Sequence, residues 1–234
     1  MKRTPRYLLR QGVCYLAGLL LIALGINISK LSSLGISPVS SVPRACELIW
    51  GFTLGTTTMI IYCLLVLTQL LVLRKKFPLR NLLGIAVAVV FGWMIDLLGT
   101  DPAAFGHLLL NFPRPETYLL RLVYLVAALG IIGLGVYLYL RPRWVPMPSE
   151  GLAGAISTVT GKLFGDCKTA VDTGMILLAL LLQLVFLGGL QSFTGDSIVI
   201  REGTVVMALC VGQVVKLLTK TTAAPLERFL GQGE

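Results

Sequence analysis

Six long apolar runs constrain the fold of this chain more than any other feature of its sequence. Each run is long enough to cross a hydrocarbon layer of about 30 Å as a helix. They cover residues 12–28, 53–73, 81–98, 118–140, 169–188 and 202–218. The 234-residue chain is 56% hydrophobic and 13% charged, which is more apolar than soluble domains are. The sequence therefore predicts an all-α membrane protein, with six transmembrane helices in one membrane domain (residues 1–234).

The basic residues predict the orientation of these helices. Cytoplasmic segments of membrane proteins carry an excess of Lys and Arg. If both termini are cytoplasmic, fifteen of the twenty basic residues fall in cytoplasmic segments. The five that fall outside are Lys30, Arg44, Arg114, Arg121 and Arg201. We interpret the net charge of +9 as this topology signal, and we expect no nucleic-acid partner.

Two segments between the runs, residues 31–52 and 141–165, are too polar and too rich in proline to be ordinary spanning helices. In the second, three prolines up to Pro148 favour an extended chain. Ser149 is then a candidate N-cap and Glu150 a first-turn acid. A face of small residues follows, which would let helices approach closely: Gly151, Gly154, Ala155, Thr158 and Gly161. We expect a half-helix that stops near Phe164–Gly165 and dips into the membrane without crossing it.

The two halves of the chain share an order of elements: a span, a broken segment, and two further spans. The first repeat covers residues 11–99 and the second residues 117–219. Four anchors support this alignment: Pro38 with Pro148, Trp50–Gly51 with Phe164–Gly165, Thr57–Ile60 with Thr173–Ile176, and Phe91–Leu98 with Val211–Leu218. Because each repeat has three spans, the second enters the membrane upside down. The sequence predicts a 3+3 inverted-topology repeat with two re-entrant half-helices, an architecture of many secondary transporters.

This arrangement predicts a substrate-binding site near the midplane, where the N-termini of the two half-helices would face each other. Free backbone N–H groups at such ends can bind a polar or anionic solute. The predicted binding residues are Ser40, Ser41, Ser149, Glu150 and Gly151. Glu150 and Glu202 are the candidates for proton coupling, since ionisable groups within a bilayer often mark a pathway. A capping role for each of these two acids remains an equal alternative.

Other charges near the spans have structural interpretations. Lys168 and Asp172 lie four residues apart, so we predict a structural ion pair on one helix face. Asp96 and Lys216 occupy matching positions near the ends of spans, and we expect both at the membrane interface.

The sequence argues against several kinds of chemistry. Five cysteines are scattered singly and no His/Cys cluster occurs, so we expect no metal site. No nucleotide-binding loop of the form G-x-x-x-x-G-K-S/T occurs, and no nucleophile–base pair lies in the spans. We therefore expect neither a cofactor nor an enzymatic activity.

Several motifs resemble a known family. The segments PSEGLAGAIS (residues 148–157), FGDCKTAVD (164–172), REGT (201–204) and LGISPVSSVP (34–43) are similar to bacterial YczE/YitT-type integral membrane proteins. The similarity covers nearly the whole chain. The resemblance implies a multi-span protein of the bacterial inner membrane and suggests transport, without naming a substrate.

The sequence is thus interpreted as a transporter of a small polar or anionic solute, with proton coupling through Glu150 or Glu202 as one mechanism. A passive channel of the same layout is an alternative, as is an accessory or scaffold subunit that transports nothing. The expected partners are the lipid bilayer and a small solute, and homo-oligomerisation is left open.

Overall fold

The computed structural model describes residues 5–101, 103–104, 106, 108–142, 144–187 and 199–230. Six of its helices are long and apolar enough to cross a membrane, as predicted. They lie in α1 (Pro5–Ser32), α3 (Leu54–Leu73), α5 (Tyr118–Leu140), α7 (Phe164–Phe186), α8 (Glu202–Leu230) and α4 (Leu83–Leu97), whose span begins at Leu79. Two single-turn 3₁₀ helices, η1 (Arg74–Lys76) and η2 (Leu79–Leu82), connect α3 to α4. The described part of the chain is all-helical and contains no strand.

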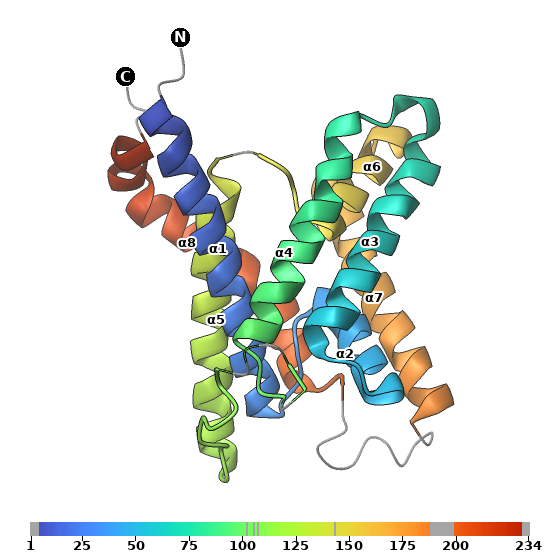
Figure 1. Cartoon of the computed structure of the whole chain (residues 1–234), viewed down its shortest axis with the longest axis vertical. Coiled ribbons are helices and arrows are strands. Elements are labelled where there is room, and N and C mark those ends of the chain that lie inside the picture. The colour runs from blue at the N-terminus through green and yellow to red at the C-terminus, as the bar shows by residue number, and fades with distance from the viewer. Residues whose placement is uncertain are drawn as a thin grey trace.

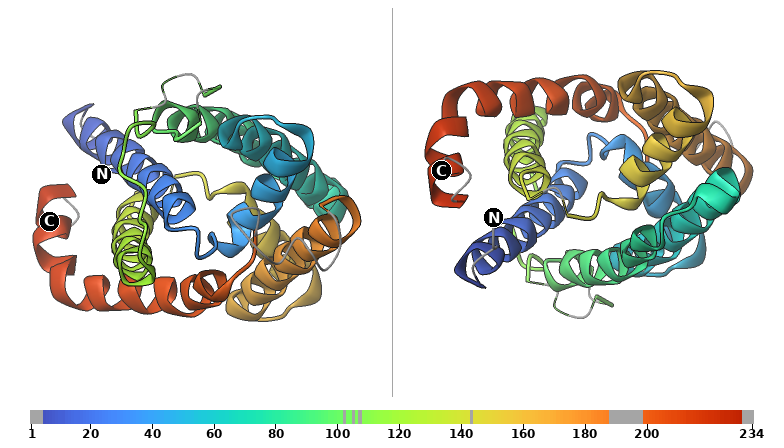
Figure 2. Two further views of the ribbon diagram at one scale, coloured as in Figure 1. Left: turned by 90° about the horizontal axis from the view of Figure 1, so that it is seen from below. Right: turned by 90° about the horizontal axis from the view of Figure 1, so that it is seen from above.

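Two shorter helices lie between the spans, α2 (Pro38–Trp50) and α6 (Pro148–Thr160), each of 13 residues. They lie toward opposite ends of the molecule (Figure 1). The start of α1 and the end of α8 lie together at the end where α6 is found (Figure 1). Viewed from either end, the helices form a ring around the chain segments that lead into α2 and α6 (Figure 2).

The two short helices begin and end in the same way. Each has a proline in its first turn, where the missing N–H costs nothing. The residues before them, Ser37 and Met147, share φ −58° and ψ 149°. Each helix ends at a left-handed glycine, Gly51 or Gly161, both with φ 71°. Pro148 follows Pro38 by 110 residues, and Gly161 follows Gly51 by the same distance.

These caps correct two predictions about α6. The N-cap is Met147 rather than Ser149, because Pro148 takes the first helical position. The helix stops at Thr160 rather than near Phe164–Gly165, because Gly161 turns the chain and its N–H bonds to the carbonyl of Ser157. Phe164 begins α7 instead, so the fifth span starts five residues before residue 169. The end of that predicted span, Gly188, lies outside the described residues.

A close crossing, made possible by two glycines, joins α1 to α5. A Cβ atom on Gly18 would lie 2.6 Å from the backbone nitrogen of Tyr139, and one on Gly135 would lie 2.8 Å from the carbonyl oxygen of Gly18. Only glycine permits this backbone approach, which is the usual role of small residues between membrane helices. Buried apolar side chains of α1, α3, α4 and α5 extend the core from this crossing.

The short helices pack across the molecule. α2 contacts α7 as well as its neighbour α3, and α6 contacts α3 as well as its neighbour α7. Each short helix therefore lies against the long helix that follows the other short helix. Through the contact between α3 and α6, residues far apart in the sequence lie together around α6.

Candidate solute site beside α6

A cavity of about 490 Å³ lies beside α6, at the end of the molecule where that helix is found. Residues of α6 line one side of it: Glu150, Gly151, Gly154, Ala155 and Thr158. The other lining residues come from the end of α3 and its connection to α4, the end of α5, the segment that leads into α6, and the start of α7. Lys76 and Asn81 add polar groups to a lining that is otherwise largely apolar.

The cavity changes the interpretation of the small-residue face of α6. The sequence predicts that this face packs closely on another helix, but most of it lines the cavity. Nothing lies within 4 Å of the position of a Cβ atom on Gly154 or Gly161. Gly151 is the exception, because a Cβ atom there would lie 2.7 Å from Oε1 of Gln69. The chain thus leaves room beside α6 at Gly154 and Gly161, whereas Gly151 packs closely on Gln69.

Gln69 joins α3 to the start of α6. Its side chain is buried, and Nε2 donates a hydrogen bond of 2.9 Å to the carbonyl oxygen of Pro148. Nδ2 of Asn81 in turn donates to Oε1 of Gln69 at 3.4 Å. A buried amide with partners on both sides fixes the position of the first turn of α6. Sequence reasoning missed Gln69; the available signal was a polar amide inside an apolar span.

Glu150 lies in the first turn of α6 and is partly buried at the cavity wall. Burial raises the pKa of Glu150 to about 7, because the charged carboxylate loses hydration. The nearby ammonium of Lys168 acts in the opposite direction, and Asp172 adds to the rise. A carboxyl group with a pKa near neutral can exchange a proton under ordinary conditions.

The predicted site residues of the other short helix lie elsewhere. Ser40 and Ser41 are buried in α2 and do not line this cavity. The hydroxyl of Ser41 donates to the carbonyl oxygen of Pro38 at 2.6 Å and lies 3.3 Å from that of Met175 in α7. Ser149 is buried within α6 and is also absent from the cavity lining. The structure therefore brings Glu150 and Gly151 together at the cavity, without the three serines.

Two of the backbone N–H groups that the sequence predicts to be free are already bonded. The N–H of Ser40 donates to Ser37, and that of Gly151 donates to Met147. Both bonds follow from the proline at the first helical position, which places these residues one turn inside their helices. Solute binding through these two groups is excluded in this conformation.

The remaining predicted charges lie as follows. Lys168 forms an ion pair with Asp172 on α7. Glu202 is exposed at the start of α8 and pairs with its neighbour Arg201 at 3.3 Å. Lys216 is exposed and Asp96 is buried near the end of α4, and their position at the membrane interface stays a prediction. The carboxylate of Asp96 accepts hydrogen bonds from the start of α3, and these bonds explain its burial.

The segments that lead into α2 and α6 are each held by an arginine from the other half of the chain. Arg201 donates to the carbonyl oxygen of Ser33 at 3.2 Å, and Arg80 donates to that of Trp144. The REGT motif adds two bonds to the first segment. The N–H of Gly203 donates to Leu34 at 2.9 Å, and Thr204 accepts from the N–H of Ile36 at 3.2 Å. The motif thus fixes the path of the chain into α2.

These features define the class of the protein: a multi-pass α-helical membrane protein with two short internal helices. The chain belongs to DUF6198, a family of unknown function. The sequence model of this family matches residues 9–220. A protein of Bacillus subtilis (strain 168), described as "Uncharacterized protein YyaS", is 27% identical over 169 residues, which are 72% of this chain and 79% of that protein. No solved structure matches the chain. Neither match assigns the chain to the YczE/YitT-type proteins, and that resemblance stays a prediction.

Proposed function

We propose that this chain is a secondary transporter of a small polar or anionic solute in a bacterial inner membrane. In this proposal, two three-span halves form an inverted repeat, and α2 and α6 are re-entrant half-helices. Both termini face the cytoplasm, and the protein is not an enzyme. The resemblance to YczE/YitT-type proteins belongs to the same proposal.

The observation that carries the proposal is the match between α2 and α6. They have the same length, and the residues before them have the same φ and ψ angles. Each ends at a left-handed glycine, and both their first residues and these glycines lie 110 residues apart. They lie toward opposite ends of the molecule, and each packs on the long helix that follows the other (Figure 1). Paired broken helices related in this way are a feature of transporters with inverted repeats.

The arginine contacts supply independent support. Arg201 lies just before α8, the third span of its half, and Arg80 lies in η2, which leads into α4, the third span of the other half. Each donates to the segment that precedes the short helix of the opposite half. An approximate two-fold relationship between the halves would explain both contacts, because it would make them equivalent.

Glu150 and the cavity beside it supply the mechanism. The small residues of α6 leave space for a solute, and the carboxyl group has a pKa near neutral. Proton uptake by Glu150 removes a negative charge from the cavity wall, which favours entry of an anion. Proton release restores that charge and favours its departure. The solute and the proton would therefore move in the same direction.

Uptake into proteoliposomes tests the proposal. Purified protein is reconstituted, and the uptake of labelled phosphate, small carboxylates and neutral amino acids is followed with and without a pH gradient. Protein-free vesicles are the control. We expect saturable uptake of one solute class, accelerated by a proton gradient directed inward. Flux that ignores the gradient and does not saturate would favour a channel, and no flux of any solute would favour an accessory subunit.

A further inference from the structure

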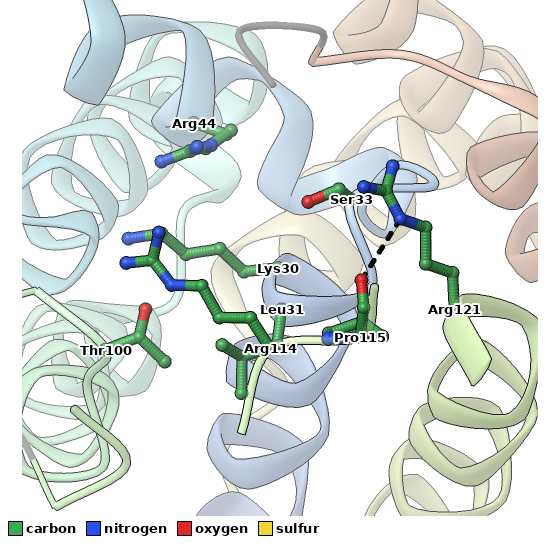
Figure 3. Close-up of a pocket in the computed structure, with 8 residues that line it drawn as sticks. All are labelled: Lys30, Leu31, Ser33, Arg44, Thr100, Arg114, Pro115 and Arg121. Atoms are coloured by element: carbon green, nitrogen blue, oxygen red, sulfur yellow. Dashed lines mark hydrogen bonds between the residues drawn. The ribbon is translucent and has the colours of Figure 1, made fainter. Parts of the chain in front are cut away.

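A second cavity, of about 170 Å³, lies where α1 ends, beside α2 and the start of α5. Its lining includes four basic side chains, Lys30, Arg44, Arg114 and Arg121, from four separate parts of the chain. Figure 3 shows the tips of Lys30 and Arg114 directed to the same part of the pocket, with Arg121 on the other side near Ser33. The hydroxyl groups of Ser33 and Thr100 complete the polar lining.

One buried carboxylate holds two of these cations in place. Oε1 of Glu47 lies 2.5 Å from Nζ of Lys30, and Oε2 lies 2.6 Å from Nη1 of Arg44. Glu47 is only 6% exposed, so this bridge is shielded from water. Sequence reasoning missed Glu47, although its spacing of three residues from Arg44 on a helix was a usable signal. The bridge fixes the positions of Lys30 and Arg44 beside the cavity.

The cavity keeps an excess of positive charge after this pairing. Asp101 also interacts electrostatically with Lys30. Four cations against the carboxylates of Glu47 and Asp101 leave two positive charges. Among the described residues, Arg114 has no hydrogen bond or ion pair, and Arg121 makes one long bond, 3.4 Å to the carbonyl oxygen of Pro115. Their guanidinium groups therefore keep most of their donors available.

The topology makes this clustering unusual. The positive-inside tendency disfavours basic residues in short segments outside the cytoplasm. Four of the five basic residues that the predicted topology places there line this single cavity. The fifth, Arg201, donates to the carbonyl oxygen of Ser33, which also belongs to the lining. Like charges gathered in this way repel one another unless an anion joins them.

We propose that this cavity binds a small oxyanion through a phosphate or carboxylate group. The planar fork of arginine matches two oxygens of either group, and charge-assisted bonds of this kind are the strong ones. The volume is below the roughly 300 Å³ at which drug-sized ligand sites begin, so the bound group is small. Lys30 and Arg44 form the fixed wall, while Arg114 and Arg121 close on the anion. Binding here does not depend on the transport proposed above.

Equilibrium binding tests the site. The full chain, purified in uncharged detergent, is titrated with sodium phosphate and with sodium succinate by calorimetry at constant ionic strength. The test variant is Arg114→Gln/Arg121→Gln, which leaves the Glu47 bridge intact. The matched control is Lys162→Gln/Lys216→Gln, which removes two exposed positive charges that do not line the cavity. Thermal unfolding of each variant checks that it is folded.

We expect at least one of the two anions to bind. The test variant should bind about tenfold more weakly or worse, since it loses charge-assisted hydrogen bonds, and the control variant should bind like the wild type. Equal losses in the two variants would reduce the effect to net charge and overturn the site. So would the absence of binding by both anions, or unchanged binding in a folded test variant.

The oxyanion could belong to a free solute or to a lipid headgroup, and nanodiscs distinguish these sources. The titration is repeated in phosphatidylcholine discs with and without phosphatidylglycerol. If phosphatidylglycerol does not change the binding of the added anion, the site takes a free anion. If phosphatidylglycerol weakens that binding in the wild type but not in the test variant, the lipid headgroup occupies the site. Competition that persists unchanged in the test variant places the lipid elsewhere and overturns the headgroup assignment. Anion binding without uptake in proteoliposomes would overturn the transport proposal and leave this site intact.

Discussion

The carboxylate of Asp96, near the end of α4, accepts a hydrogen bond of 2.8 Å from the backbone N–H of Gly55, at the start of α3. Its second oxygen accepts one of 2.7 Å from the hydroxyl of Thr53, which itself accepts from the N–H of Thr56. A side chain of α4 therefore caps the start of α3, the span before it, and satisfies donors that α3 itself leaves free. A charge near a helix N-terminus is also stabilised by the helix dipole.

Loss of this cap should destabilise the protein. Asp96→Ala leaves the N–H of Gly55 buried without its acceptor, and we expect a loss of about 1–3 kcal/mol. Asp96→Asn keeps one oxygen acceptor and should lose less. Thermal unfolding of the purified variants in detergent measures both effects. An alanine variant as stable as the wild type would show that the cap contributes nothing.

The crossing of α1 and α5 provides a second prediction. Gly18→Ala places a methyl group within 2.6 Å of the backbone of Tyr139, so the two helices must separate. We expect a destabilisation of about 1–3 kcal/mol, as for overpacked cores. Gly130→Ala, in α5 itself, is the matched control, because nothing lies within 4 Å of that position. Similar unfolding temperatures for the two variants would contradict a close-packed crossing.

A third prediction follows from the raised pKa of Glu150. The group binds a proton more tightly in the folded protein than at its ordinary value of 4.5. Its contribution to stability is therefore present below pH 4.5 and is lost as the pH rises through about 7. Glu150→Gln should remove this part of the decline in stability between pH 5 and pH 8. If the stabilities of the wild type and Glu150→Gln fall by the same amount between pH 5 and pH 8, the prediction is wrong.

Transport measurements test Glu150 separately from stability. If this carboxyl group carries the coupled proton, Glu150→Gln should retain exchange of solute but lose its response to a pH gradient. Glu202→Gln is the comparison, because Glu202 is exposed and paired with Arg201. We expect that variant to remain coupled. Unchanged coupling in Glu150→Gln would leave Glu150 as a helix-terminal acid without a role in transport.

The sequence predicts the spans well because long apolar runs have few alternatives in a bilayer. It also locates the two short helices, through Pro38 and Pro148. The end of α6 was misplaced because any of several glycines can stop a helix, and the sequence does not show which one turns left-handed. The Trp50–Gly51 anchor was accordingly paired with Phe164–Gly165, whereas the structure pairs Gly51 with Gly161.

The candidate sites depended on contacts that the sequence does not reveal. Glu150 was singled out because the predicted half-helix places its carboxyl group within the bilayer, where ionisable groups often mark a pathway. Gln69 and Glu47 were missed, because their roles arise only when α3 meets α6 and when α1 meets α2. The hydrogen bonds of Asp96 were missed for the same reason: one partner, Gly55, lies 41 residues away on another span.

The last prediction concerns the inverted arrangement itself. Phe52 and Lys162 are exposed, lie 110 residues apart, and each follows the glycine stop of a short helix. In the proposed topology, the first faces the outside and the second the cytoplasm. Cysteines introduced at these positions should therefore react with a membrane-impermeant maleimide from opposite sides. Cys63 and Cys210 are replaced by alanine beforehand, since the other three native cysteines are buried.

In intact cells, Phe52→Cys should be labelled, and Lys162→Cys should be labelled only after permeabilisation. A re-entrant half-helix ends on the side of the membrane from which its segment entered. The end of α2 should therefore face the outside and the end of α6 the cytoplasm. The Cys63→Ala/Cys210→Ala background without an added cysteine measures residual labelling. Labelling of both positions in intact cells, or of both only after permeabilisation, would place α2 and α6 on the same side. The inverted repeat would then be wrong, whatever the similarity of the two helices.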